Sequence, residues 1–199
     1  PTTGDVYNPC KGKTWMNKNL GASQVATSSD YPLAYSDLYQ WGRLTDGHEK
    51  RISSTTSTMS NSDVPGHGDF IVNTLLTNLA GDWRQPKKNN LWQGVTGTNN
   101  PCPSGYRIPA YAELEAERLC WSSNGADGAF ASPLKWTIAG FRHWNQISGI
   151  IYGTGAIGKY WTSQVNGYAS KFLTFFQGNG LLSQPLERAA GVSVRCIKN

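Results

Sequence analysis

The pattern of apolar and polar positions predicts helices in the first two thirds of the chain. Residues 110–121 (AYAELEAERLCW) form the clearest predicted helix, because they follow a proline, contain Ala, Glu and Leu, and bring Leu114 and Leu119 near one face. A shorter helix is predicted over residues 35–43, between a serine N-cap and a glycine stop. Residues 70–79 are expected to add one or two helical turns.

After residue 135 the pattern changes to short apolar segments bounded by Gly, Asn or Pro, which is typical of strands. These segments are KWTIAGF, GIIYG, YWTSQV, KFLTFF and GVSVRCIK. Residues 4–20 contain an Asn-Pro and a Lys-Gly turn and predict a hairpin, while residues 44–68 and 81–105 are expected to be long loops. Because the predicted helices come early in the chain and the predicted antiparallel strands come late, we expect an α+β fold. We also expect a single domain over residues 1–199.

The composition favours a folded domain over disorder. Hydrophobic residues make up 38% of the chain and charged residues only 16%, and the eight tryptophans can bury a large area. No run of 18 apolar residues occurs, so no membrane span is expected. The chain begins at Pro1 without a methionine and shows no signal peptide, so we expect a processed or excised piece of a longer protein.

The net charge of +5 is unevenly placed. Seven Lys or Arg residues follow Asp127, but only one carboxylate, Glu187, does. Because these cations are scattered rather than clustered, they make a weak footprint for nucleic acid. They suit an acidic glycan or an acidic protein surface equally well.

Motifs that suggest catalysis or cofactor binding are incomplete. Residues 153–158 (GTGAIG) match a dinucleotide-binding pattern, but a strand-like segment follows where a helix is needed. His67 with Asp63 and Asp69 is open to a metal or acid–base interpretation, although side chains that satisfy turn backbone are the more favoured interpretation. Glu113, Glu115 and Glu117 are expected to form a solvated helix face. We therefore expect no enzyme activity, no cofactor and no metal.

The four cysteines allow several arrangements. Cys10, Cys102, Cys120 and Cys196 form no C-x-x-C pair, and no histidine stands at zinc-ligand spacing from them. The sequence leaves open four free thiols or any of the three possible sets of two disulfides.

Several segments together resemble one known family. They are KTWMNKNLGA (13–22), LYQWGRLTDGH (38–48), NPCPSGYRIP (100–109), AELEAERL (112–119), KYWTS (159–163) and RAAGVSVRCIK (188–198). This set resembles the Fibrobacter succinogenes major paralogous domain, a group of bacterial and viral surface domains with a C-type-lectin-like fold. The resemblance implies two helices, a twisted antiparallel sheet and long loops. It also implies a Cys102–Cys196 disulfide and leaves Cys10 and Cys120 for an extra bridge.

The resemblance further implies a ligand-binding surface near the C-terminus, because related lectin-like domains are targets of diversity-generating retroelements. Residues 143–152 and 168–187 depart from the family pattern, whereas Tyr160 and Trp161 belong to the expected core. The predicted ligand-binding residues are His143, Trp144, Gln146, Ile147, Ile150, Tyr152, Tyr168, Phe172, Thr174, Phe176, Asn179 and Leu181. The calcium-dependent sugar motifs of true C-type lectins and the cysteine pattern of formylglycine-generating enzymes are both absent.

These features predict a receptor- or ligand-binding domain on a virion or cell surface, with variation by a retroelement as a further hypothesis. The expected partner is a protein or glycan on a target cell. The alternatives are a carbohydrate-binding adhesin module with a fixed ligand, on which Trp and Tyr would stack against sugar rings, and a hydrolase or oxidase that uses His67 and Asp69.

Overall fold

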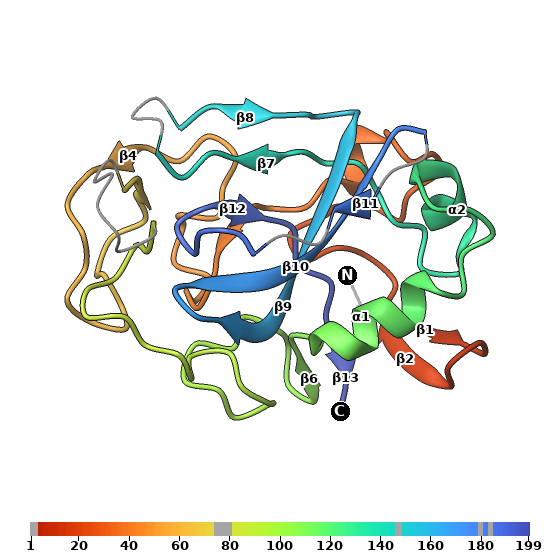
Figure 1. Cartoon of the computed structure of the whole chain (residues 1–199), viewed down its shortest axis with the longest axis horizontal. Coiled ribbons are helices and arrows are strands. Elements are labelled where there is room, and N and C mark those ends of the chain that lie inside the picture. Colours follow the sequence, from red (N-terminus) through yellow and green to blue (C-terminus); the bar gives the residue numbers. More distant parts are fainter. Residues whose placement is uncertain (1–3, 74–80, 146–148, 179–180, 183–184) are drawn as a thin grey trace.

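Short strands in small sheets form most of the regular structure in the described part of the chain (Figure 1). The computed structural model describes residues 4–73, 81–145, 149–178, 181–182 and 185–199, with 181 and 182 described by their strand pairing. The strands are β1 (Asp5–Asn8), β2 (Lys13–Met16), β3 (Tyr39–Gln40), β4 (Thr55–Thr56), β5 (Phe70–Ile71), β6 (Tyr106–Arg107), β7 (Phe141–Arg142), β8 (Ile151–Tyr152), β9 (Ile157–Asn166), β10 (Ala169–Phe176), β11 (Leu181–Leu182), β12 (Gly191–Val192) and β13 (Ile197–Lys198). The helices are α1 (Tyr111–Arg118), α2 (Ala126–Ala131) and a 3-10 turn, η1 (Pro32–Ala34).

All described strand pairs are antiparallel except β4 with β5, which confirms the predicted α+β class. The strands near the two ends of the chain share one sheet of order β1-β2-β13-β6. The β1–β2 hairpin confirms the hairpin predicted over residues 4–20. Ile197 of β13 pairs with both Trp15 and Arg107, so the end of the chain is held between two early segments.

The β9–β10 hairpin separates two hydrophobic cores. Its longest run of pairs places Phe172 opposite Trp161 and Leu173 opposite Tyr160. Because side chains alternate along a strand, Trp161 and Phe172 enter one core while Tyr160 and Leu173 enter the other. All four are at most 5% exposed, which confirms Tyr160 and Trp161 as core residues.

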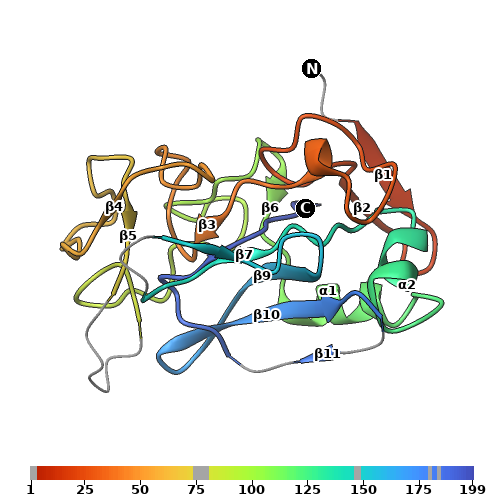
Figure 2. The same cartoon turned by 90° about the horizontal axis from the view of Figure 1, so that it is seen from above.

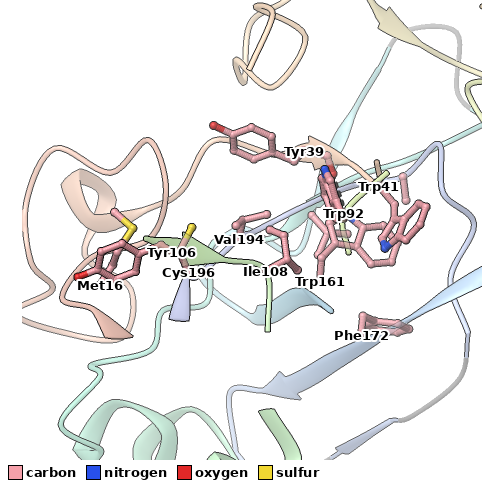
Figure 3. Close-up of a cluster of buried hydrophobic side chains, with 12 residues drawn as sticks. Met16, Tyr39, Trp41, Trp92, Tyr106, Ile108, Trp161, Phe172, Val194 and Cys196 are labelled. Atoms are coloured by element: carbon pink, nitrogen blue, oxygen red, sulfur yellow. Dashed lines mark hydrogen bonds between the residues drawn. The ribbon is translucent and has the colours of Figure 1, made fainter. Parts of the chain in front are cut away.

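Buried tryptophans connect the long loops to the sheets (Figure 3). The indole N–H of Trp41 donates to the Thr162 carbonyl at 2.9 Å, and that of Trp161 donates to the Tyr39 carbonyl at 2.7 Å. Trp92 donates in the same way to a carbonyl of the loop after β3. Each ring therefore buries a large apolar area and also satisfies a backbone acceptor.

Two disulfides cross the fold. Cys102–Cys196 joins the loop before β6 to the segment before β13, and Cys10–Cys120 joins the β1–β2 hairpin to the end of α1. The Cys102–Cys196 pairing is the one that the family resemblance implied, and the second bridge joins the two cysteines that the resemblance left over. The described residues contain no free cysteine.

The structure corrects the predicted helix over residues 35–43. The segment forms strand β3 after the η1 turn, and Leu38, Tyr39, Gln40 and Trp41 are all at most 1% exposed. A segment buried on every side needs backbone and side-chain partners in other elements. Gln40 supplies them, because its amide donates to the carbonyls of Ile71 and Ala189. Tertiary burial has overridden the local helical pattern.

Other predicted element bounds also change. Residues 70–71 form a strand rather than a helical turn, and residues 74–79 lie outside the described part of the chain. In the predicted strand KWTIAGF only Phe141 belongs to a strand, because the backbone before it bonds to loops, as Ile138 N–H does to the Ser29 carbonyl. The segment GVSVRCIK divides into β12 and β13, and α2 had no predicted counterpart.

The carboxylates of α1 do not form a solvated face, and that prediction is wrong. Glu113 binds Arg107 and also receives the Ala110 N–H at the start of the helix. Glu117 is 2% exposed, because it faces the β1–β2 hairpin and α2. Glu113 and Glu117 therefore bond to neighbouring groups and hold the helix in place, instead of facing solvent.

No helix in the described ranges has the length and apolar character required to cross a bilayer.

Candidate functional site

Four aromatic side chains lie next to one another on and after the β7–β8 hairpin, and we call them the aromatic patch: Phe141, His143, Trp144 and Tyr152. Phe141 and Tyr152 are directly paired across the hairpin, with ring centroids 6.1 Å apart. The His143 ring lies 5.6 Å from that of Tyr152 and stacks on Trp144 at 5.7 Å. Tyr152 is 38% exposed and the other three are half-buried, so the patch borders solvent.

Arg142 holds the hairpin from its opposite face. Strand alternation turns Phe141 and His143 to one side and Arg142 to the other, where it is buried. Its guanidinium donates to the carbonyls of Gly149 and Ser53 at 2.9 and 2.7 Å. Burial lowers the pKa of Arg142 to about 10, which leaves it charged at neutral pH.

The turn before β8 depends on glycine at position 149. Gly149 has φ +59°, and a Cβ there would lie 2.4 Å from the Arg142 guanidinium. The absence of a side chain lets the guanidinium approach the turn and fix it. The patch is therefore presented by a braced hairpin.

Trp144 anchors the patch to other segments of the chain. Its carbonyl accepts the Asn73 N–H at 2.8 Å, and its ring lies against Gly81, which also has the Cβ of Glu187 as a close neighbour. A Cβ at Gly81 would lie 2.6 Å from the Trp144 ring, so glycine permits this close approach. Segments near residues 73, 81 and 187 thereby converge on one edge of the patch.

Lys159 of β9 lies on the other edge. Its Nζ is 3.6 Å from the ring centroid of Phe141 and 5.3 Å from that of Phe172. Burial lowers the pKa of Lys159 to about 8, while the charge of Glu187 acts in the opposite direction. Burial also lowers the pKa of His143, which Glu187 raises and Lys159 lowers further. The site thus combines aromatic rings with a cation.

The structure brings only some of the predicted ligand-binding residues to this surface. His143, Trp144 and Tyr152 form the patch, and Ile150 next to it is 45% exposed. Phe172 and Thr174 are 5% and 1% exposed, because the face of β10 that carries them packs inside the protein. Their predicted direct contact with a ligand is therefore corrected to a buried supporting position.

Other predicted residues lie elsewhere. Phe176 is half-buried at the end of β10, where it pairs with Ile157. Leu181 pairs with Phe175, and its side chain lies outside the description. Gln146, Ile147 and Asn179 lie outside the described residues.

Tyr168 belongs to a second surface, at the turn between β9 and β10 (Figure 2). It is 60% exposed, and the Lys87 Nζ lies 4.4 Å from its ring centroid. Together with Lys87, Met59, Arg84, Gln85 and Pro86 it lines a pocket of about 250 Å³. Lys159 and Tyr168 lie toward opposite ends of β9, roughly 20 Å apart along an extended strand.

Sequence reasoning missed Phe141 and Lys159, which it assigned to the family framework. A signal for Lys159 was available. It directly precedes the predicted strand YWTSQV and is two residues from Trp161, so continuing the strand alternation by one residue places its amine on the same face as a core tryptophan.

A group of three metal-ligating side chains, Asp46, His48 and Glu49, occurs in the described residues. His48 Nδ1 lies 2.6 Å from Asp46, and His48 Nε2 accepts the Gln40 N–H at 3.0 Å. Both ring nitrogens are therefore occupied, and Asp46 also binds the Arg43 guanidinium at 2.7 Å. This arrangement fits a structural network better than a metal site, since a metal would displace existing bonds next to a cation.

The other candidate chemical motifs take structural positions. Asp63 pairs with Arg84 and Lys88 rather than with His67. His67 lies 3.6 Å from Asp69 with both side chains more than a third exposed, outside any buried cleft. Residues 153–158 form the turn from β8 into β9, and no helix follows them as dinucleotide binding requires.

Comparison with known proteins gives no relative from which the site could be interpreted: no protein-family model, curated protein or solved structure matches the chain.

Proposed function

We propose that this chain is a ligand- or receptor-binding surface domain with a C-type-lectin-like fold, related to the Fibrobacter succinogenes major paralogous domains. The observation that carries the proposal is the aromatic patch, where four contiguous rings border solvent on a braced hairpin. Aromatic side chains dominate binding energy at protein interfaces. Rings that are already packed against one another lose little conformational entropy on binding.

The two disulfides support an extracellular setting, on a cell or a virion. Disulfides form and persist in oxidising compartments, and both described bridges span about half of the chain. The expected partner is a protein or glycan of a target cell.

Binding arrays of cell-surface ectodomains and glycans test the proposal. Tyr152→Ala should weaken a hit found with the unaltered protein by tenfold or more, because it removes the most exposed ring of the patch. Tyr7→Ala is the matched control, since Tyr7 is 61% exposed on the β1–β2 hairpin. Equal loss in both variants, or retention of the hit in Tyr152→Ala, would contradict binding through the patch.

A carbohydrate-binding adhesin is the second candidate, and the pocket beside Tyr168 favours it. An exposed tyrosine at the rim of a pocket of about 250 Å³ can stack on a sugar ring. Hits confined to glycans and sensitive to Tyr168→Ala but not Tyr152→Ala would favour this candidate.

Sequencing of the locus across a source population tests diversification. Substitutions concentrated in residues 143–187 would indicate a varied binding surface. An even spread along the chain would rule out the retroelement interpretation and favour a fixed ligand.

A further inference from the structure

Lys159 is a charged side chain on the face of β9 and β10 that carries the buried rings of Trp161 and Phe172. It is paired with Thr174, and side chains of directly opposed residues project to the same face. Its neighbours on that face include Trp161 and Phe172, which are both in the core cluster. An ammonium group on such a face has lost much of its hydration, which is costly unless another group compensates.

The compensation visible in the structure is incomplete. The rings of Phe141 and Phe172 provide cation–π contacts. Glu187 influences the amine at a distance, but no carboxylate in the described part of the chain lies within ion-pair range of Nζ. Beside it, the Thr174 hydroxyl is buried and makes no hydrogen bond to a described residue.

Other buried cations of the protein differ in this respect. Arg43 binds Asp46, Arg188 lies 3.6 Å from Asp82, and Arg195 donates to the carbonyls of Met16 and Leu134. Each of these cations faces an anion or backbone acceptors of the same chain. Lys159 instead faces the edge of the aromatic patch, where an acceptor can arrive from outside.

We propose that Lys159 is the anion-binding centre of the aromatic patch and that it receives an Asp or Glu carboxylate of a protein ligand, next to an apolar or aromatic side chain of that ligand. This inference rests on the proposed function and defines the ligand class of that site. The carboxylate would pair with Nζ while the neighbouring apolar side chain packs on Phe141 and Tyr152. Apolar flanks favour an acidic side chain of a protein over a hydroxyl-rich acidic sugar.

The inference can be tested without knowing the natural ligand, by titrating the protein with phenylacetate. In protein labelled with ¹³C-lysine, the Lys159 Cε signal should shift with phenylacetate and not with the uncharged isostere phenylacetamide. Affinity should fall about tenfold between pH 7 and pH 9, as Lys159 loses its proton. Glu187 and His143 are the other ionisable groups whose charge interacts with this amine.

Lys159→Gln should reduce phenylacetate affinity tenfold or more. Lys171→Gln is the control, because Lys171 also lies over an aromatic ring, that of Tyr111 at 4.6 Å, on the neighbouring strand. Equal affinity for phenylacetate and phenylacetamide would overturn the inference, as would full affinity in Lys159→Gln. Tighter binding of glucuronate than of phenylacetate would overturn the choice of a protein side chain.

The titration of the unaltered protein keeps the inference testable if Lys159→Gln does not fold. The small probes also separate the two proposals. Phenylacetate binding at Lys159 with no hit on the arrays would count against the proposed function alone, and array hits that are unaffected by Lys159→Gln would count against the anion centre alone.

Discussion

At the scale of single residues, buried polar side chains fix the long loop that follows β3. His48 is fully buried, and it connects Asp46 to the backbone of Gln40 through its two ring nitrogens. Because Nε2 accepts a hydrogen bond, Nδ1 carries the proton and donates it to Asp46. The neutral ring is therefore built into the network.

His48 should make the protein sensitive to mild acid. Burial lowers the pKa of His48 to about 4 from 6.5, so between these pH values the unfolded chain binds a proton that the folded chain does not. The free energy of unfolding should therefore fall as pH falls from 6.5 towards 4, by an amount on the order of 2 kcal/mol. Asp82, whose pKa burial raises to about 6, contributes in the opposite direction.

Urea unfolding at pH 7 and pH 5 measures the contribution of His48 to the pH dependence of stability. His48→Gln should lower stability at pH 7 and yet lose less between the two pH values than the unaltered protein, since the Asp82 contribution is common to both. His67→Gln, which changes an exposed loop histidine, is the surface control for the substitution itself. An unaltered pH dependence in His48→Gln would refute the assignment.

At the scale of the element, α1 is positioned by one buried acid. Glu117 accepts hydrogen bonds from Asn8 of β1, from Ser132 after α2 at 2.6 Å, and from the Trp136 indole at 3.3 Å. One carboxylate thus orients the helix, the β1–β2 hairpin and the α2 segment. Unsatisfied buried donors would remain if it were removed.

Glu117→Ala should reduce the free energy of unfolding by about 2–4 kcal/mol, because the three donors above and the Trp121 indole lose a buried acceptor. Glu115→Ala on the same helix removes only the partly exposed pair with Arg118 and should cost less than about 0.5 kcal/mol. Chemical denaturation of both variants measures the difference. Similar losses would show that Glu117 has no special structural role.

At the scale of the whole molecule, disulfides and shared sheets join distant segments. Cys10–Cys120 and Cys102–Cys196 have sequence separations of 110 and 94 residues, so their effects on unfolded-chain entropy should be nearly equal, roughly 5 kcal/mol each. They differ in the folded state. Cys196 lies in the core with 0% exposure, whereas Cys10 is exposed.

Replacing Cys102 and Cys196 together by alanine should therefore destabilise the protein more than replacing Cys10 and Cys120, by about 1 kcal/mol or more, because it also leaves a cavity in the core. Thermal or urea unfolding of the two double variants provides the comparison. The reverse order would mean that the β1–β2 hairpin depends on its bridge more than the core depends on Cys196.

How much of the site could be predicted depended on whether its residues are local. His143, Trp144 and Tyr152 stand close together in the segment 143–152, which departs from the pattern of the family that the chain resembles, so the sequence could identify them. Lys159 lies next to these residues although it belongs to another strand. Phe172 and Thr174 were predicted to belong to the same surface, but they are buried. Neither effect has a local signature, because both depend on which surfaces pack together.

The sequence by itself determined the elements whose signals are local. These are the helix over residues 111–118, the first hairpin, the long β9 and β10 strands and the α+β class. Only the tertiary structure decided that residues 39–40 form a strand, that Glu117 is buried and that a lysine lies at the edge of the aromatic patch. The physical reason is that turn formation and side-chain alternation act over a few residues, whereas burial and pairing of polar groups depend on distant neighbours.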